Sequence, residues 1–189
     1  AVPFGHPLNA GQMGPRGNAI ASRLMKEADV ILALGTRIGF NATFYSYDNI
    51  NSAAKIIHVE QDPTAIGRYF PVALGIWGDA PTVSKQLLLE AKKFNQRKEA
   101  LAWSETLISD RRLFLAQRDT DALIQSKPIQ PSGLYKTLRE VCPKESSYTM
   151  DAGTLCLQAT DALNYWQPKS LFTPLDFGLV GFSFAAGLG

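Results

Sequence analysis

Two short apolar runs, residues 30–34 and 56–59, constrain the fold of this chain more than any other feature. The runs VILAL and IIHV contain almost no polar residue, which is the pattern of strands buried on both faces of a parallel sheet. Polar and turn residues follow each run at once, at 35–37 and at 60–62. Ligands bind at the carboxyl ends of strands in open α/β sheets. We therefore expect a helix-covered sheet with a binding site at this edge.

The order of patterns up to residue 94 predicts a doubly wound α/β domain. A helix with apolar residues at i, i+3 and i+4 spacing occupies 19–28, a short helix begins at Pro63, and a third apolar run covers 72–77. Another helix begins at Pro81. Strands that alternate with helices form a parallel, Rossmann-like sheet. Residues 1–4 have the pattern of the end of a strand, so we expect the first strand of this domain to be missing.

The remainder of the chain predicts a helical linker and a second α/β unit. An apolar stripe of spacing seven marks a long helix that ends before the prolines at 128 and 131. A helix with Leu134, Leu138 and Val141 inward ends at Pro143, and strands near 148–150 and 170–173 and a helix after 154 follow. The predicted organisation is a central nucleotide-binding-like domain at 1–92, a helical linker at 93–127, and a truncated second unit at 128–189.

Composition excludes several classes of protein. The 189 residues include 19 basic and 17 acidic side chains, a net charge of +2. No basic stripe is present, which argues against nucleic acid and anionic membranes as partners. No apolar run approaches the ~20 residues of a membrane span. Two cysteines, Cys142 and Cys156, provide no disulfide framework, so a cytoplasmic protein with reduced thiols is expected.

Several motifs suit phosphate or nucleotide binding, and each has a structural alternative. Glycines at 11, 14 and 17 precede a helix, either to bind an anion or to allow close packing. Arg37 could pair with a phosphate or form a surface ion pair. Glu60 could bind a ribose, and Asp79 could meet a nucleotide or cap a helix. Together they make a nucleotide crevice at the strand ends plausible.

A second phosphate motif is Asp151-Ala-Gly-Thr154, which places backbone N–H groups and a hydroxyl at a helix start. This arrangement suits a diphosphate, and an N-cap with a tight turn is the alternative. His6 and His58 have no metal-like neighbours in the sequence. Hydrolase and zinc motifs are absent from it.

The order of these motifs resembles one known family. GQMGPRGN, EADVILALGTR, AKIIHVEQDPTAIG and GIWGDA resemble the central domain of thiamine-diphosphate enzymes of the acetolactate synthase and 2-keto-acid decarboxylase group. PIQP, YTMDAGT and FGLVGFSFAAGLG resemble the start of that group's third domain, which binds the diphosphate of the cofactor. The resemblance covers nearly the whole chain and implies an enzyme, a lyase or a transferase, that makes or breaks a carbon–carbon bond next to a carbonyl.

The resemblance implies specific roles in cofactor binding. Gly153 and Thr154 match the loop that reaches thiamine diphosphate. Gly178 matches the glycine whose carbonyl accepts a hydrogen bond from the aminopyrimidine. Val180 matches the apolar residue beneath the bent cofactor, which holds the amino group near the reacting carbon. Val is smaller than the residues usual at that position, so Leu179 is the alternative for this role.

The resemblance also implies a wider context for the chain. Arg37 and Glu60 match positions that contact FAD or ADP in relatives that bind a nucleotide in the central domain, and other relatives bind none. The glutamate that activates the pyrimidine and the motif that binds Mg²⁺ match nothing in this chain. We therefore expect an inactive fragment without catalytic residues or metal ligands. The parent should use a 2-keto acid or related donor and form a dimer or tetramer.

Two other readings of the sequence stay open. One is a free-standing module that binds FAD, ADP or NAD and has no chemistry of its own. The other is a central domain that serves only as a scaffold between subunits.

Overall fold

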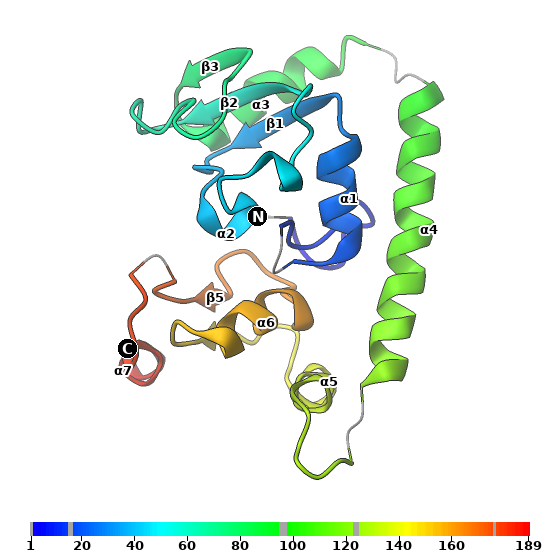
Figure 1. The fold of residues 1–189 in the computed structure, drawn as a ribbon, viewed down its shortest axis with the longest axis vertical. Coiled ribbons are helices and arrows are strands. Elements are labelled where there is room, and N and C mark those ends of the chain that lie inside the picture. Colours follow the sequence, from blue (N-terminus) through cyan, green and yellow to red (C-terminus); the bar gives the residue numbers. More distant parts are fainter. Residues whose placement is uncertain (1, 15–16, 95–97, 123–124, 176) are drawn as a thin grey trace. The chain divides into compact units, whose positions relative to one another are not determined.

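A computed structural model describes residues 2–14, 17–94, 98–122, 125–175 and 177–189 (Figure 1). The chain forms two compact units, Gln12–Trp103 and Ala1–Gly11 with Ser104–Gly189. The division between them lies within the long helix. The domain boundaries that we expected at residues 92 and 127 stay a prediction. None of the helices among the described residues is long and apolar enough to cross a membrane.

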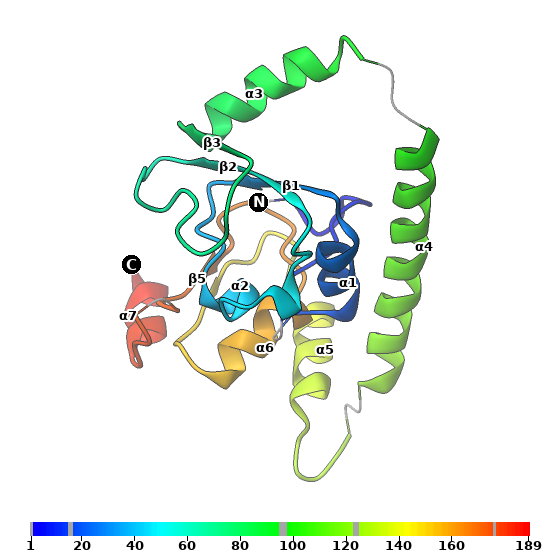
Figure 2. The ribbon, with the colours of Figure 1, turned by 45° about the horizontal axis from the view of Figure 1, so that its top comes forward.

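The unit Gln12–Trp103 is an α/β layer built on three parallel strands, which confirms the predicted fold class. The strands have the order β1-β2-β3, and the register pairs Ile31 with Ile56 and Val59 with Ile76. Figure 2 shows α3 on one side of the sheet and α1 and α2 on the other. The elements are α1 (Ala19–Glu27), β1 (Val30–Leu34), α2 (Phe40–Thr43), the 3-10 turn η1 (Tyr47–Asn49), β2 (Lys55–Glu60), β3 (Leu74–Trp77) and α3 (Ala80–Ala91).

One face of this sheet forms the core of the unit. Ile31, Ala33 and Ile56 pack against Ile38, Ile50 and Phe70, all of them buried. The other residues of β1, which are Val30, Leu32 and Leu34, are exposed. The prediction that β1 is buried on both faces was therefore wrong. The reason is that α3, the helix on that side of the sheet, packs mainly against the central strand β2.

Two elements predicted from local patterns do not form. Residues 2–4 are not a strand, because the Phe4 N–H donates to the carbonyl of Tyr165 rather than to a neighbouring strand. Residues 63–67 form turns instead of a helix. The Asp62 side chain accepts the N–H of Thr64, as expected for a cap, but Gly67 adopts a positive φ of 68° that stops helix formation.

The second unit has its core between α5 and α6. Tyr135, Ala159 and Leu163 are buried there, and the Tyr135 hydroxyl donates to the carbonyl of Leu155. Because Tyr135 takes the inward position, Leu134 and Val141 are exposed, which contradicts the prediction that they point inward. The elements are α4 (Lys98–Asp121), α5 (Pro131–Val141), β4 (Tyr148–Thr149), α6 (Thr154–Ala162), β5 (Leu171–Phe172) and α7 (Phe182–Leu188), with β4 and β5 parallel.

Candidate functional site

The carboxyl ends of the three parallel strands bring the first group of predicted residues together. The Gly35 N–H donates to the carbonyl of Val59, and the Gly78 N–H donates to the carbonyl of Glu60. These bonds align the residues that follow β1, β2 and β3 at one edge of the sheet. The expected convergence of the strand ends is therefore present.

The carboxylates at this edge accept hydrogen bonds from neighbouring residues of the protein itself. Glu60 Oε1 accepts the N–H groups of Gln61 at 2.8 Å and Asp62 at 3.3 Å. Asp79 accepts the N–H of Thr82 at 2.9 Å, which caps α3, and an amide N–H of Gln61 at 2.9 Å. The hydrogen bonds from Thr82 lower the pKa of the Asp79 carboxyl. Helix capping, the structural alternative, therefore accounts for Asp79.

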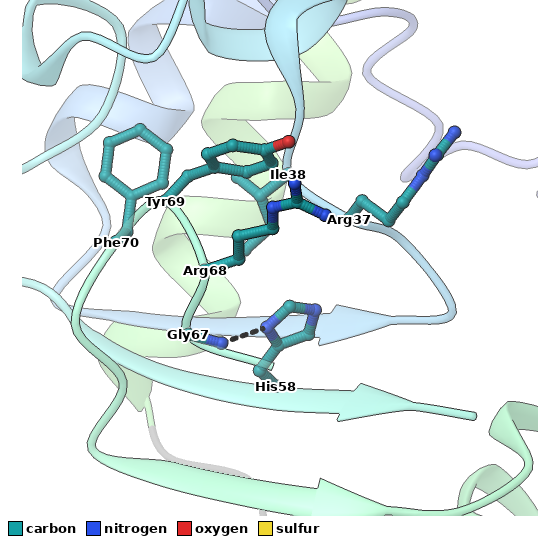
Figure 3. Close-up of a pocket in the computed structure, with 7 residues that line it drawn as sticks. All are labelled: Arg37, Ile38, His58, Gly67, Arg68, Tyr69 and Phe70. Carbon is teal, nitrogen blue, oxygen red and sulfur yellow. Dashed lines mark hydrogen bonds between the residues drawn. The ribbon is translucent and has the colours of Figure 1, made fainter. Parts of the chain in front are cut away.

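A shallow hollow lies beside the ends of β1 and β2 (Figure 3). Its ligand-accessible volume is close to zero, whereas a typical small-molecule site holds roughly 300–1,000 Å³. In Figure 3 the Arg68 side chain lies over the hollow, whereas the end of the Arg37 side chain extends away from His58. The described hollow is therefore too small to hold a nucleotide. Its lining residues are Arg37, Ile38, His58, Gly67, Arg68, Tyr69 and Phe70.

His58 connects the two loops that border this hollow. Its Nε2 lies 2.7 Å from the carbonyl of Thr36, and its Nδ1 lies 3.4 Å from the N–H of Gly67. These partners require a neutral ring with the proton on Nε2, because Nδ1 faces a donor. The side chain is almost completely buried. His58 therefore has the structural role that its lack of metal-like neighbours indicated.

The glycine motif at 11, 14 and 17 serves close packing. Gly14 has a φ of 92°, and a Cβ there would lie 2.1 Å from the carbonyl oxygen of Ala42. A Cβ on Gly17 would lie 2.0 Å from the carbonyl oxygen of Gln12. The start of α1 is capped by Asn18, whose side chain accepts the N–H of Ala21. Of the two roles considered for this motif, the geometry supports the structural one.

The second group of predicted residues is gathered in the other unit, where two loops meet. The Ala152 N–H donates to the carbonyl of Leu179 at 3.1 Å. The Asp151 carboxylate accepts the N–H groups of Gly181 at 2.9 Å and Ser183 at 2.7 Å. Loop 151–154, which contains Gly153 and Thr154, thus lies against loop 177–181. Residues far apart in the sequence are held together here by three hydrogen bonds.

The joined loops present polar backbone and apolar side chains to their surroundings. Gly153 and Gly178 have φ values of 142° and 64°, and a Cβ on either would meet no atom within 4 Å. These glycines are needed for backbone conformation rather than for packing. Among the described residues, none donates a hydrogen bond to the Gly178 carbonyl. Val180 is 83% exposed, and Leu179 is also exposed.

Sequence reasoning assigned no individual role to Asp151. The hydrogen bonds from Gly181 and Ser183 lower the pKa of its carboxyl, so it is ionised at neutral pH. An aspartate after a short strand is too common to indicate a contact thirty residues away. The described residues contain no group of three or more His, Cys, Asp or Glu side chains placed to hold a metal ion.

Comparison with known proteins identifies the family. Residues 1–87 match the family described as thiamine pyrophosphate enzyme, central domain. The whole chain aligns with the sulfoacetaldehyde acetyltransferase of Roseovarius nubinhibens at 31% identity, over 34% of that protein. It aligns over 99% of its length with a probable acetolactate synthase large subunit of Methanocaldococcus jannaschii at 30% identity, over 32% of that protein.

Residues 1–87 are a central domain of the thiamine pyrophosphate enzymes. The resemblance seen in the motifs is therefore confirmed. The chain spans about a third of the length of these relatives.

Individual site roles in this thiamine pyrophosphate enzyme chain stay predictions. They comprise cofactor contacts for Gly153, Thr154, Gly178, Leu179 and Val180. The comparisons do not support a flavin in the central domain. The roles of Arg37 and Glu60 with FAD or ADP likewise stay predictions.

Proposed function

We propose that the protein containing this chain is a thiamine diphosphate-dependent transferase or lyase. It would make or break a carbon–carbon bond next to a carbonyl, with a 2-keto acid or a related compound as donor. Family membership supports the cofactor class. The names of the relatives, an acetyltransferase and an acetolactate synthase, favour transfer of a two-carbon acyl group over simple decarboxylation.

The observation that carries this proposal is the meeting of loops 151–154 and 177–181. The two loops are joined by the bond from Ala152 to Leu179 and leave the Gly178 carbonyl without a donor among the described residues. The exposed Val180 follows two residues later. An acceptor beside an apolar side chain fits an aminopyrimidine, which has both a donor group and an apolar ring face. The residues present therefore fit the cofactor.

Each residue of these loops would have a distinct task. The Gly178 carbonyl would accept the amino group and fix the orientation of the pyrimidine. Val180, assisted by Leu179, would support the bent conformation from below. Gly153 is the N-cap of α6 and Thr154 its first residue, and the first N–H groups of this helix suit a diphosphate. When bound, the cofactor supplies a carbon nucleophile that adds to the donor carbonyl. Mg²⁺ is proposed to take its protein ligands from outside this chain.

Calorimetric titration of the full-length protein that contains this chain, with thiamine diphosphate and Mg²⁺, tests the proposal. We expect saturable binding, and a Val180→Ala variant should bind about tenfold more weakly because one apolar contact of roughly 1.4 kcal/mol is lost. Leu179→Ala is the matched comparison and should have the smaller effect if Val180 is the support. Absence of binding by the wild-type protein would refute the function. A screen of 2-keto acids would then identify the donor.

We further propose that the active protein is a homo-oligomer, a dimer or a tetramer. Exposed apolar side chains lie on and around loop 177–181 and α7, and large apolar patches mark interaction sites. We expect that the 189-residue polypeptide alone has no thiamine-dependent turnover. Light scattering of the full-length protein that contains this chain checks the oligomeric state. An activity assay of the 189-residue polypeptide checks the absence of turnover. The exposed residues are Phe177, Leu179, Val180, Phe184 and Leu188.

A free-standing nucleotide-binding module is the less favoured function. The strand-end hollow is small, and the carboxylates of Glu60 and Asp79 are bonded within the protein. Parallel titrations with FAD, ADP or NAD and with thiamine diphosphate plus Mg²⁺ separate the two proposals, because the module would bind a nucleotide and would not bind the thiamine cofactor.

A further inference from the structure

We propose that Asp151 is a positioning residue, which holds the Gly178–Val180 segment in the conformation that receives the cofactor. This inference rests on the proposed function. Asp151 does not itself contact the cofactor in this proposal. It acts through the two N–H groups that its carboxylate accepts.

The geometry makes Asp151 a clamp between the two loops. Its two carboxylate oxygens are used separately: Oδ2 accepts the N–H of Gly181 at 2.9 Å, and Oδ1 accepts the N–H of Ser183 at 2.7 Å. Both distances are those of charge-assisted hydrogen bonds. The bond from Ala152 to the Leu179 carbonyl lies directly beside this clamp. The segment 178–180 is therefore held at Leu179 and just beyond its carboxyl end.

This segment needs such a clamp because its backbone is intrinsically free. Gly178 and Gly181 both have positive φ values, 64° and 94°, and glycine loses more conformational entropy on ordering than any other residue. The side chains of Leu179 and Val180 are exposed, so apolar burial within the described chain does little to hold them. The Gly178 N–H donates to the Pro174 carbonyl at 3.0 Å, and the hydrogen bonds to Asp151 add the restraint on the carboxyl side of the segment.

A graded series of variants tests this role. Asp151→Ala removes both acceptors, whereas Asp151→Asn keeps one acceptor oxygen and loses the charge. We expect amide hydrogen exchange at Gly181 and Ser183 to be about tenfold faster in Asp151→Ala, with Asp151→Asn in between. The affinity of the full-length protein that contains this chain for thiamine diphosphate with Mg²⁺ should fall from wild type to Asp151→Asn to Asp151→Ala. The decrease in Asp151→Ala should be about tenfold.

Asp62 provides the matched control. Its exposed carboxylate also accepts a backbone N–H, that of Thr64 at 2.9 Å, but it lies in the other unit. Asp62→Ala should leave both the exchange at Gly181 and the cofactor affinity unchanged. If Asp151→Ala alters stability as Asp62→Ala does and leaves cofactor affinity intact, Asp151 is only a cap and the positioning role is wrong.

The two readouts separate failure of this inference from failure of the proposed function. Hydrogen exchange needs no cofactor, so unchanged exchange in Asp151→Ala and Asp151→Asn overturns the clamp directly. Faster exchange with unchanged cofactor affinity overturns the positioning role while the function stands. If the wild-type protein binds no thiamine diphosphate, the proposed function fails, and the positioning role fails with it even where the exchange data show a clamp. If Asp151→Ala does not fold, Asp151→Asn alone decides.

Discussion

Replacement of Gly14 by alanine should destabilise the protein strongly. The φ of Gly14 is 92°, and the added Cβ would lie 2.1 Å from the carbonyl oxygen of Ala42 and 2.7 Å from its carbonyl carbon. Neither contact can relax by rotation of a side chain, because the facing atoms belong to the backbone. The substitution therefore requires the segment before α1 and the helix α2 to move apart.

The cost can be estimated from two terms. A left-handed backbone costs an alanine about 1–2 kcal/mol relative to glycine, and overpacking costs about 1–3 kcal/mol. The sum is about 2–5 kcal/mol, a large part of the roughly 5–15 kcal/mol that stabilises a typical domain. With a urea m value of about 1.5 kcal/mol/M, the unfolding midpoint should fall by about 1–3 M.

Urea unfolding followed by circular dichroism measures this shift. Gly39→Ala is the matched control, because Gly39 has a φ of −85° and a Cβ there would meet no atom within 4 Å. Its unfolding free energy should stay within about 0.5 kcal/mol of the wild-type value. If Gly14→Ala is equally neutral, the packing explanation of the glycine motif is wrong. A neutral Gly14→Ala that also lost ligand binding would restore the anion-binding alternative.

Three other substitutions test separate parts of the structure. Val59 is fully buried in the central strand, so Val59→Ala should lower the unfolding free energy by about 2 kcal/mol in the same urea assay. The bonds from Thr82 lower the pKa of Asp79, so their stabilisation is complete above the unfolded pKa and is lost as pH falls through the folded value. The stability difference between Asp79→Asn and wild type should accordingly shrink from about pH 5 to about pH 2, and a constant difference would contradict the assignment. Burial raises the pKa of Tyr165, so wild-type stability should fall as pH rises above about 10. Tyr165→Phe loses the hydrogen bond to the Ala159 carbonyl, so its free energy of unfolding near pH 7 should be about 1 kcal/mol lower than that of the wild type. The stability of this variant should not fall in the same way above about pH 10, because phenylalanine does not ionise.

The strands and the family could be predicted because their signals are local. The run at 30–34 forms β1 with the same limits, since an apolar segment followed by a glycine turn specifies both the strand and its end. The motifs around 151–154 and 178–181 also identified the family, because glycines and their spacing reflect backbone conformations that few other residues adopt. Both of these loops have positive φ values at their glycines.

Local patterns failed where burial depends on distant neighbours. The unbroken apolar run of β1 predicted burial of both faces of the strand, yet Val30, Leu32 and Leu34 are exposed. In α5, Leu134 and Tyr135 are adjacent, and it is Tyr135 that packs into the buried cluster of the second unit and donates to the Leu155 carbonyl. Residues 63–67 had a helical pattern, but the positive φ of Gly67 and its bond to His58 make them a turn.

The sequence alone determined the class of fold, the parallel strands and the membership in the thiamine pyrophosphate enzymes, because these depend on patterns within a few residues of one another. Only the tertiary structure decided that Gly14 packs against Ala42, that His58 joins two loops, and that Asp151 holds loop 177–181 against loop 151–154. Each of these contacts joins residues that lie from nine to thirty-two positions apart. Such contacts form only when the chain folds, so no local sequence pattern indicates them.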